Sequence, residues 1–166
     1  TYYLGRSQPP FFSLMVQLLA EQKSDDVVVE FLPALIKEYE FWMEGASKVT
    51  AQWPEHKRVV RLPDGEILNR YFDNITSPRA EMYQDDVELI KTRGERGKQT
   101  LLSIRAACES GWDFSSRWFE VPDDLSTIIT TQLVQVDLNC LLYHLERMIE
   151  KGFRLKADEK SAARYS

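Results

Sequence analysis

The stretch ESGWDFSSRW, residues 109–118, places two tryptophans, an aspartate and an arginine within ten positions. Asp113 lies between Trp112 and Phe114, and Gly111 comes just before them. Aromatic neighbours remove water from a carboxyl group, and this desolvation raises its pKa, which favours a proton donor near neutral pH. Aromatic faces also stack on the C–H faces of sugar rings, and a glycine lets the backbone turn and approach a ligand closely. The stretch therefore indicates a general acid in a sugar site, with the alternative that the rings are ordinary core and Asp113 caps the next turn.

Two further polar clusters favour the same chemistry. Arginine forks and carboxylates together can hold many hydroxyl groups in a fixed geometry. The members are Arg6, Ser7 and Gln8 in one cluster and Arg70, Asp73, Arg79 and Glu81 in the other. For any one of these residues taken alone, a surface ion pair or a helix cap is the simpler interpretation. The presence of three such clusters in one chain shifts the balance toward a binding site.

Composition limits the other functions. The chain has 166 residues, a 43% hydrophobic and 28% charged composition and a formal net charge of -5, as expected for one globular domain. Lysines and arginines are scattered, so no nucleic-acid interface is indicated, and no apolar run approaches the ~20 residues of a membrane span. His56 and His144 have no second ligand at helical spacing, and Cys108 and Cys140 form neither a metal-type spacing nor a disulfide framework. We therefore expect no metal site and no cofactor.

The elements that must position these residues are mostly helical. Helices are expected over 9–24, 25–45, 78–93, 97–111 and 137–152. The first is apolar on nearly every face and should be buried on most sides. In the second, Pro33 is expected to break or restart the helix, and in the last, Asp137 is a candidate cap. The run RVVRLPDGEILNRY, residues 58–71, predicts two short strands joined at Asp64-Gly65. The predicted fold is all-α with one small hairpin near 57–72.

These motifs, taken in order, carry a family resemblance. The segments YYLGRSQPPFF, ILNRYFD, SPRAE, SGWDFSSRW and TTQLVQVDLN closely resemble those of the α,α-trehalases, inverting glycoside hydrolases that split trehalose into two glucoses. The resemblance covers essentially the whole chain. It implies that Asp113 is the catalytic acid that protonates the bridging oxygen and that Gly111 lines the sugar site. It also implies that four side chains contact the substrate: Arg6, Gln8, Arg79 and Glu81.

The same resemblance implies a partial catalytic domain. Ala80 stands where the family often has proline, which affects the loop backbone rather than its two flanking side chains. The family's PGGRF and QWDxPxGWAP signatures and its general-base glutamate are not in residues 1–166. We therefore expect the chain to be the middle part of an (α/α)6 barrel, to need the remainder of that domain for catalysis, and to self-associate through uncovered apolar faces.

Alternatives stay open on function and location. A helical carbohydrate-binding module that has lost catalysis would keep the same tryptophan and arginine contacts, and a purely structural scaffold is a weaker possibility. Arg117 and Trp118 could touch substrate or brace the loop from behind. Without a native N-terminus in view, periplasmic, secreted and cytoplasmic locations all remain open, and the first two are favoured over the third.

Overall fold

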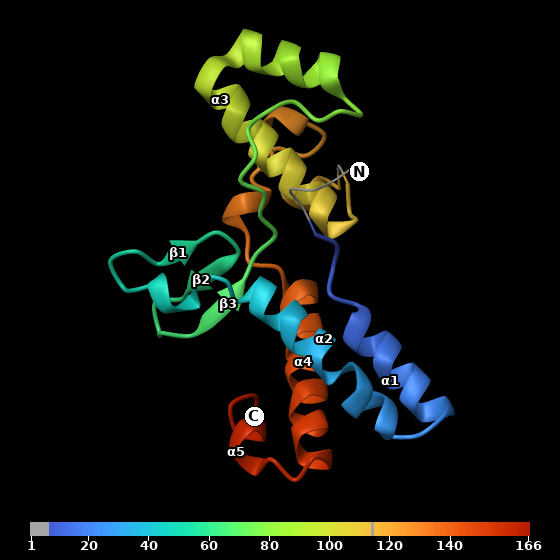
Figure 1. Cartoon of the computed structure of the whole chain (residues 1–166). Coiled ribbons are helices and arrows are strands. Elements are labelled where there is room, and N and C mark those ends of the chain that lie inside the picture. The colour runs from blue at the N-terminus through green and yellow to red at the C-terminus, as the bar shows by residue number, and fades with distance from the viewer. Residues whose placement is uncertain (1–6, 114) are drawn as a thin grey trace.

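The computed structural model describes residues 7–113 and 115–166, and it is mostly helical with one small antiparallel sheet (Figure 1). The all-α prediction is therefore confirmed. The helices are α1 (Phe12–Gln22), α2 (Asp26–Trp42), α3 (Tyr83–Ser110), α4 (Val136–Leu155) and α5 (Glu159–Ala162), and the strands are β1 (Glu55–His56), β2 (Val59–Arg61) and β3 (Ile67–Asn69). Single 3-10 turns span Ala46–Lys48, Ser116–Trp118, Leu125–Thr127 and Thr130–Gln132.

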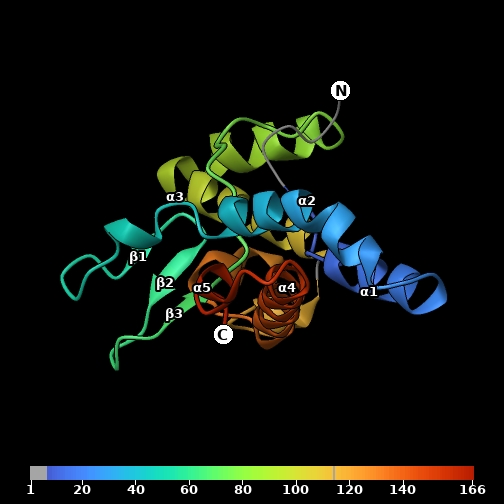
Figure 2. The same ribbon diagram turned by 60° about the horizontal axis from the view of Figure 1, so that its bottom comes forward.

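The core lies where α1, α2 and α4 pack together, with α5 folded against α4 (Figures 1 and 2). The apolar face predicted for the last long helix is largely buried; its members are Leu138, Leu142, Leu145 and Met148, while Leu141 is half-buried. From α2, Val28, Leu32 and Leu35 are buried against it. The two helices approach closely at Gly152, where an added Cβ would lie 2.8 Å from Leu32 Cδ1. Burial of such a side chain contributes ~1.5–3 kcal/mol, so this face accounts for much of the stability.

Two predicted helix boundaries are wrong. α2 continues through Pro33 without a break. Pro33 is exposed, so water can bond the carbonyl that its missing N–H leaves free, while Leu32 and Leu35 hold both halves on the core. At α4 the capping position is Gln135, and Asp137 lies inside the first turn, where a carboxylate still favours the helix dipole.

The predicted hairpin is confirmed and gains a strand. β2 and β3 pair with Val59 opposite Asn69 and Arg61 opposite Ile67, and Gly65 takes a φ of 103° in the turn between them. β1 adds to the other edge of β2 as an antiparallel strand. The sequence did not predict β1 because two residues carry no alternating pattern.

The two helices expected over 78–93 and 97–111 form one element, α3. Gly94 interrupts it with φ 56° and ψ -127°, and the chain bends there (Figure 1). The element starts at Tyr83, later than the expected start at residue 78. Most buried residues lie in its second half, including Leu101, Ile104 and Glu109. That half carries the candidate site at its C-terminal end.

α1 is less buried than the sequence predicted. Only Ser13, Val16 and Ala20 are buried, whereas Met15 and Leu18 are each 62% exposed. An apolar stripe on the outside of a chain is what a partial toroid would present to its neighbours. The predicted self-association stays a prediction.

Candidate functional site

The candidate site lies at the C-terminal end of α3 and in the loop that follows it. Gly111 ends the helix in the left-handed region, with φ 74° and ψ 1°. Most side chains avoid this conformation, because Cβ approaches the following carbonyl, so glycine suits the position. The hydroxyl of Ser110 then accepts a hydrogen bond from the Trp112 amide at 3.0 Å. The loop therefore leaves the helix in a defined direction and presents Asp113 two residues later.

Trp118 braces this loop from behind. Its indole Nε1 donates to the Trp112 carbonyl oxygen at 2.7 Å, and its side chain is fully buried. Its ring packs edge-on against Tyr71, with the centroids 6.3 Å apart, and Tyr71 packs in the same way on Trp42. Burial, together with the charges of Asp137 and Glu109, raises the pKa of Tyr71, so the phenol stays neutral. Of the two roles left open for Trp118, these contacts favour bracing the loop.

Arg117 lies over one face of the Trp112 ring. Its guanidinium carbon lies 4.3 Å from the centroid of Trp112, and its Nη1 lies 3.8 Å from Asp137 Oδ2. The Trp112 side chain is 53% exposed. A cation over an indole face is a favourable contact, so Arg117 orients this exposed ring.

Asp113 is itself exposed. Within the described residues, Trp118 is turned into the core and Trp112 is half-covered by Arg117, while Phe114 lies outside the described residues. The ring-lined, water-poor environment expected for Asp113 is therefore not provided by the described part of this chain. Gly111 is also exposed, and an added Cβ there would meet no atom of the described residues within 4 Å.

A buried carboxylate that the sequence analysis missed, Glu109, connects the loops around the site. Its Oε1 accepts from the Ser7 amide at 2.9 Å and from Arg58 Nη2 at 2.5 Å, and its Oε2 accepts from the Phe72 amide at 2.9 Å. The side chain has no exposed area. Local sequence gave no signal for this role, because the partners lie 37 to 102 residues away along the chain.

The three polar clusters converge on the last turn of α3. Ser7 and Phe72 bond Glu109, and Arg79 Nη1 lies 3.7 Å from Cys108 Sγ. Gln8 is exposed next to Ser7, and Glu81 is exposed two residues after Arg79. Arg6 lies outside the described residues. The structure thus brings the predicted segments together, although it does not test their contacts with a sugar.

Several of the predicted polar residues are buried and paired within the protein. Arg79 binds both oxygens of Asp86, with Nε to Oδ2 at 2.9 Å and Nη2 to Oδ1 at 2.7 Å. Asp73 accepts from Arg105 Nε at 2.9 Å. Arg70 pairs with Glu55 and donates from Nη1 to the Thr131 carbonyl oxygen at 2.7 Å. These arginines hold loops in place, which accounts for their clustering without a ligand.

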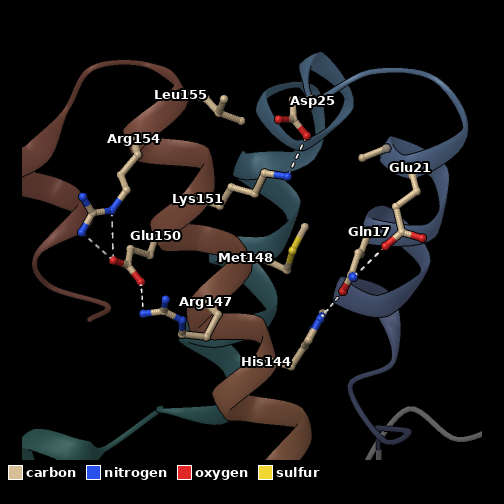
Figure 3. A pocket seen from close by; sticks show the side chains of 11 residues that line it. Gln17, Glu21, Asp25, His144, Arg147, Met148, Glu150, Lys151, Arg154 and Leu155 are labelled. Atoms are coloured by element: carbon tan, nitrogen blue, oxygen red, sulfur yellow. Dashed lines mark hydrogen bonds and ion pairs between the residues drawn. The ribbon is translucent and has the colours of Figure 1, made fainter.

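A separate cleft of about 600 Å³ lies between α1 and α4 (Figure 3). Its charged groups pair with one another: Lys151 with Asp25 at 2.6 Å, and Arg154 with Glu150 at 2.8 Å. On its inner side, His144 Nε2 lies 2.6 Å from Gln17 Oε1 and Nδ1 lies 2.9 Å from the Ser13 hydroxyl. Because the Gln17 oxygen can only accept, His144 donates from Nε2 and accepts at Nδ1. The cleft is lined by α1, α4 and the turn before α2 and does not include the loop of Asp113.

Residues 7–113 and 115–166 contain no group of three or more His, Cys, Asp or Glu side chains arranged to hold a metal ion. No helix among them is both long enough and apolar enough to cross a membrane.

Comparison with known proteins gives the same family as the motifs. The family model described as Trehalase matches residues 1–166. The chain is 47% identical to the periplasmic trehalase of Citrobacter koseri and 46% identical to that of Salmonella dublin, in each case over 99% of this chain. It spans 29% of the length of each of these relatives. The extent of the match and the site motifs together place this chain in the trehalase family.

Proposed function

We propose that the protein carrying this chain hydrolyses α,α-trehalose to two glucose molecules with inversion, and that Asp113 is the general acid. The observation that carries the proposal is the family match over residues 1–166 with close identity to periplasmic trehalases. Asp113 supports it as an exposed carboxylate on a loop whose backbone is fixed by Gly111 and Trp118. The substrate contacts proposed beside it are Arg6, Gln8, Arg79, Glu81 and Gly111.

The mechanism requires a second carboxylate. An inverting glycosidase places an acid and a base ~6.5–9.5 Å apart, with water between the base and the sugar. Of the carboxylates near this loop, Glu109 is buried in an ion pair with Arg58, and Asp137 lies 3.8 Å from Arg117 Nη1. We therefore propose that the general base is supplied by polypeptide beyond these residues and that the isolated segment is inactive or nearly so. General acid or base assistance is each worth ~10²–10⁴-fold.

The test compares wild-type full-length protein with Asp113→Asn, with glucose release from trehalose as the assay. The amide keeps the shape of the side chain but cannot donate the proton, so turnover should fall by ~10²–10⁴-fold. The matched control is Asp85→Asn, an exposed aspartate in the first turn of α3, which should keep wild-type turnover. Sugar binding by calorimetry without glucose release from the wild type would instead support the non-catalytic binding module.

The names of the relatives also support a periplasmic location. We propose that location for the full protein. Osmotic-shock fractionation of cells that express it should release trehalose hydrolysis into the periplasmic fraction, and retention with a cytoplasmic marker would contradict the proposal.

A further inference from the structure

Glu109 is a single buried carboxylate that joins three separate segments. Ser7 donates its amide at 2.9 Å, Phe72 donates its amide at 2.9 Å, and Arg58 donates from Nε at 3.1 Å and from Nη2 at 2.5 Å. The charge has no exposed area. A buried charge is retained only where hydrogen bonds and an opposite charge compensate its desolvation, and all four contacts do so here.

Two of the attached segments lie next to residues that the sequence singles out for the site. Ser7 is followed by Gln8, and Phe72 is followed by Asp73, which bonds Arg105 on α3. Glu109 itself comes two residues before Gly111 and four before Asp113. A small movement of this carboxylate would therefore shift the Ser7–Gln8 segment, which precedes α1, relative to the loop of Asp113.

Arg58 anchors the carboxylate to the core. Its guanidinium carbon lies 4.4 Å from the ring centroid of Phe41 and 5.5 Å from that of Trp42, at the end of α2. Its carbonyl oxygen accepts from the Arg70 amide at 2.8 Å, which ties it to the chain that leaves β3. The sheet and α2 thus hold Arg58, and Arg58 holds Glu109.

We propose that Glu109 is a positioning residue that sets the placement of the Asp113 acid against the Ser7–Gln8 loop, an inference that rests on the function proposed above. Glu109 acts through hydrogen bonds to the backbone amides of Ser7 and Phe72, while its own helix turn leads directly into the loop of Asp113. Such placement matters because a displacement of about 1 Å in a catalytic geometry can lower the rate by ~10²-fold.

The test is Glu109→Gln in the full-length protein. The amide keeps the side-chain volume but replaces one acceptor oxygen with an NH2 donor. In one orientation this donor faces the Phe72 amide, and in the other it faces the Ser7 amide and Arg58, so a donor meets a donor in both. On trehalose, kcat should fall by ~10²-fold. On α-glucosyl fluoride, whose fluoride leaves without a proton, the loss should stay below ~10-fold, because misplacement of an acid does not affect that departure.

Glu150→Gln is the matched control. Glu150 is also buried and bound by two arginines, Arg147 and Arg154, but it lies on α4 beside the separate cleft (Figure 3). This variant should keep wild-type kcat on both substrates. A general defect of a buried ion pair would appear in both variants, whereas a positioning defect appears only in Glu109→Gln.

Equal losses on both substrates, or no loss on either, would overturn the inference. Should Glu109→Gln not accumulate as folded protein, Arg58→Lys supplies the same comparison, because lysine keeps the charge but cannot donate from two nitrogens to Glu109 as arginine does. Equal losses on the two substrates in Arg58→Lys also overturn the inference.

Asp113→Asn, assayed in parallel, separates the proposed function from the positioning role. If Asp113→Asn keeps full turnover, the proposed function fails; if it is inactive while Glu109→Gln is normal, only the positioning role fails.

Discussion

The buried pair of Arg79 and Asp86 yields a stability prediction with a defined magnitude. Asp86 accepts three hydrogen bonds from Arg79, from its amide at 2.7 Å, from Nε at 2.9 Å and from Nη2 at 2.7 Å. The residues are 5% and 1% exposed. Burial by itself lowers the pKa of Arg79, but the hydrogen bonds and charge of Asp86 raise it overall. The guanidinium thus stays charged and depends on Asp86.

Asp86→Asn removes the countercharge and leaves the guanidinium buried. Loss of one partner of a buried ion pair costs ~3–5 kcal/mol. Both residues also line a hollow of about 360 Å³, which lets water reach the freed cation, so we expect the lower end of that range, about 3 kcal/mol. Urea unfolding of the full-length protein, followed by tryptophan fluorescence, measures the change. Glu95→Gln is the control, because the Glu95–Lys98 pair on the same helix is exposed and should change stability by less than ~1 kcal/mol.

A double-mutant cycle isolates the pair from other effects of each substitution. Arg79→Met combined with Asp86→Leu removes both charges. The free energy of unfolding lost by this double variant should be smaller, by ~2 kcal/mol, than the sum of the losses in Arg79→Met alone and Asp86→Leu alone. The reasoning is refuted if Asp86→Asn costs under about 1 kcal/mol or if the two losses simply add.

Three further predictions concern other parts of the fold. Gly97→Ala should lower the free energy of unfolding measured in urea by ~1–3 kcal/mol. Its Cβ would lie 2.4 Å from the Leu89 carbonyl oxygen, and a backbone atom cannot move away as a flexible side chain can. Unchanged stability would contradict the close approach. Burial lowers the pKa of His144, so the folded state binds fewer protons than the unfolded state. Stability is therefore lost as the pH falls below the pKa that His144 has in the unfolded state. The melting temperature should therefore drop from pH 7 to pH 5 by less in His144→Gln than in the wild type, and equal drops would argue against it. Burial raises the pKa of Glu38, whose Oε2 has no hydrogen-bond partner among the described residues. Its ionisation therefore opposes folding as the pH rises above the pKa that Glu38 has in the unfolded state. Glu38→Gln should stabilise the protein by about 0.5 kcal/mol at pH 7, a value kept low by solvent screening, and should have no such effect at pH 3.

The helical elements were predictable because their signals are local. The apolar spacing of residues 137–152 identified the face of α4 that packs on α2, and the Asp64-Gly65 turn identified the hairpin. Pro33 was misjudged because its cost to a helix is local, whereas the packing of Leu32 and Leu35 that outweighs it is not. The burial of α1 was also misjudged, because an apolar helix shows that a partner is needed and not where that partner lies.

At the site, residue types were readable from the sequence and their connections were not. Motif order identified Asp113, Gly111 and Arg79 as candidates, and the structure brings their segments to one end of α3. The environment of Asp113 was predicted from its aromatic neighbours, but adjacent side chains on a loop point in different directions. Trp118 therefore lies in the core while Asp113 is exposed.

The sequence by itself determined the helical class, the family and the residues that are able to do the chemistry, because periodicity and motif order are properties of neighbouring positions. Only the tertiary structure decided that Glu109 joins Ser7, Phe72 and Arg58. Those contacts close loops of 37 to 102 residues, and a buried charge finds its partners through the packing of the whole chain.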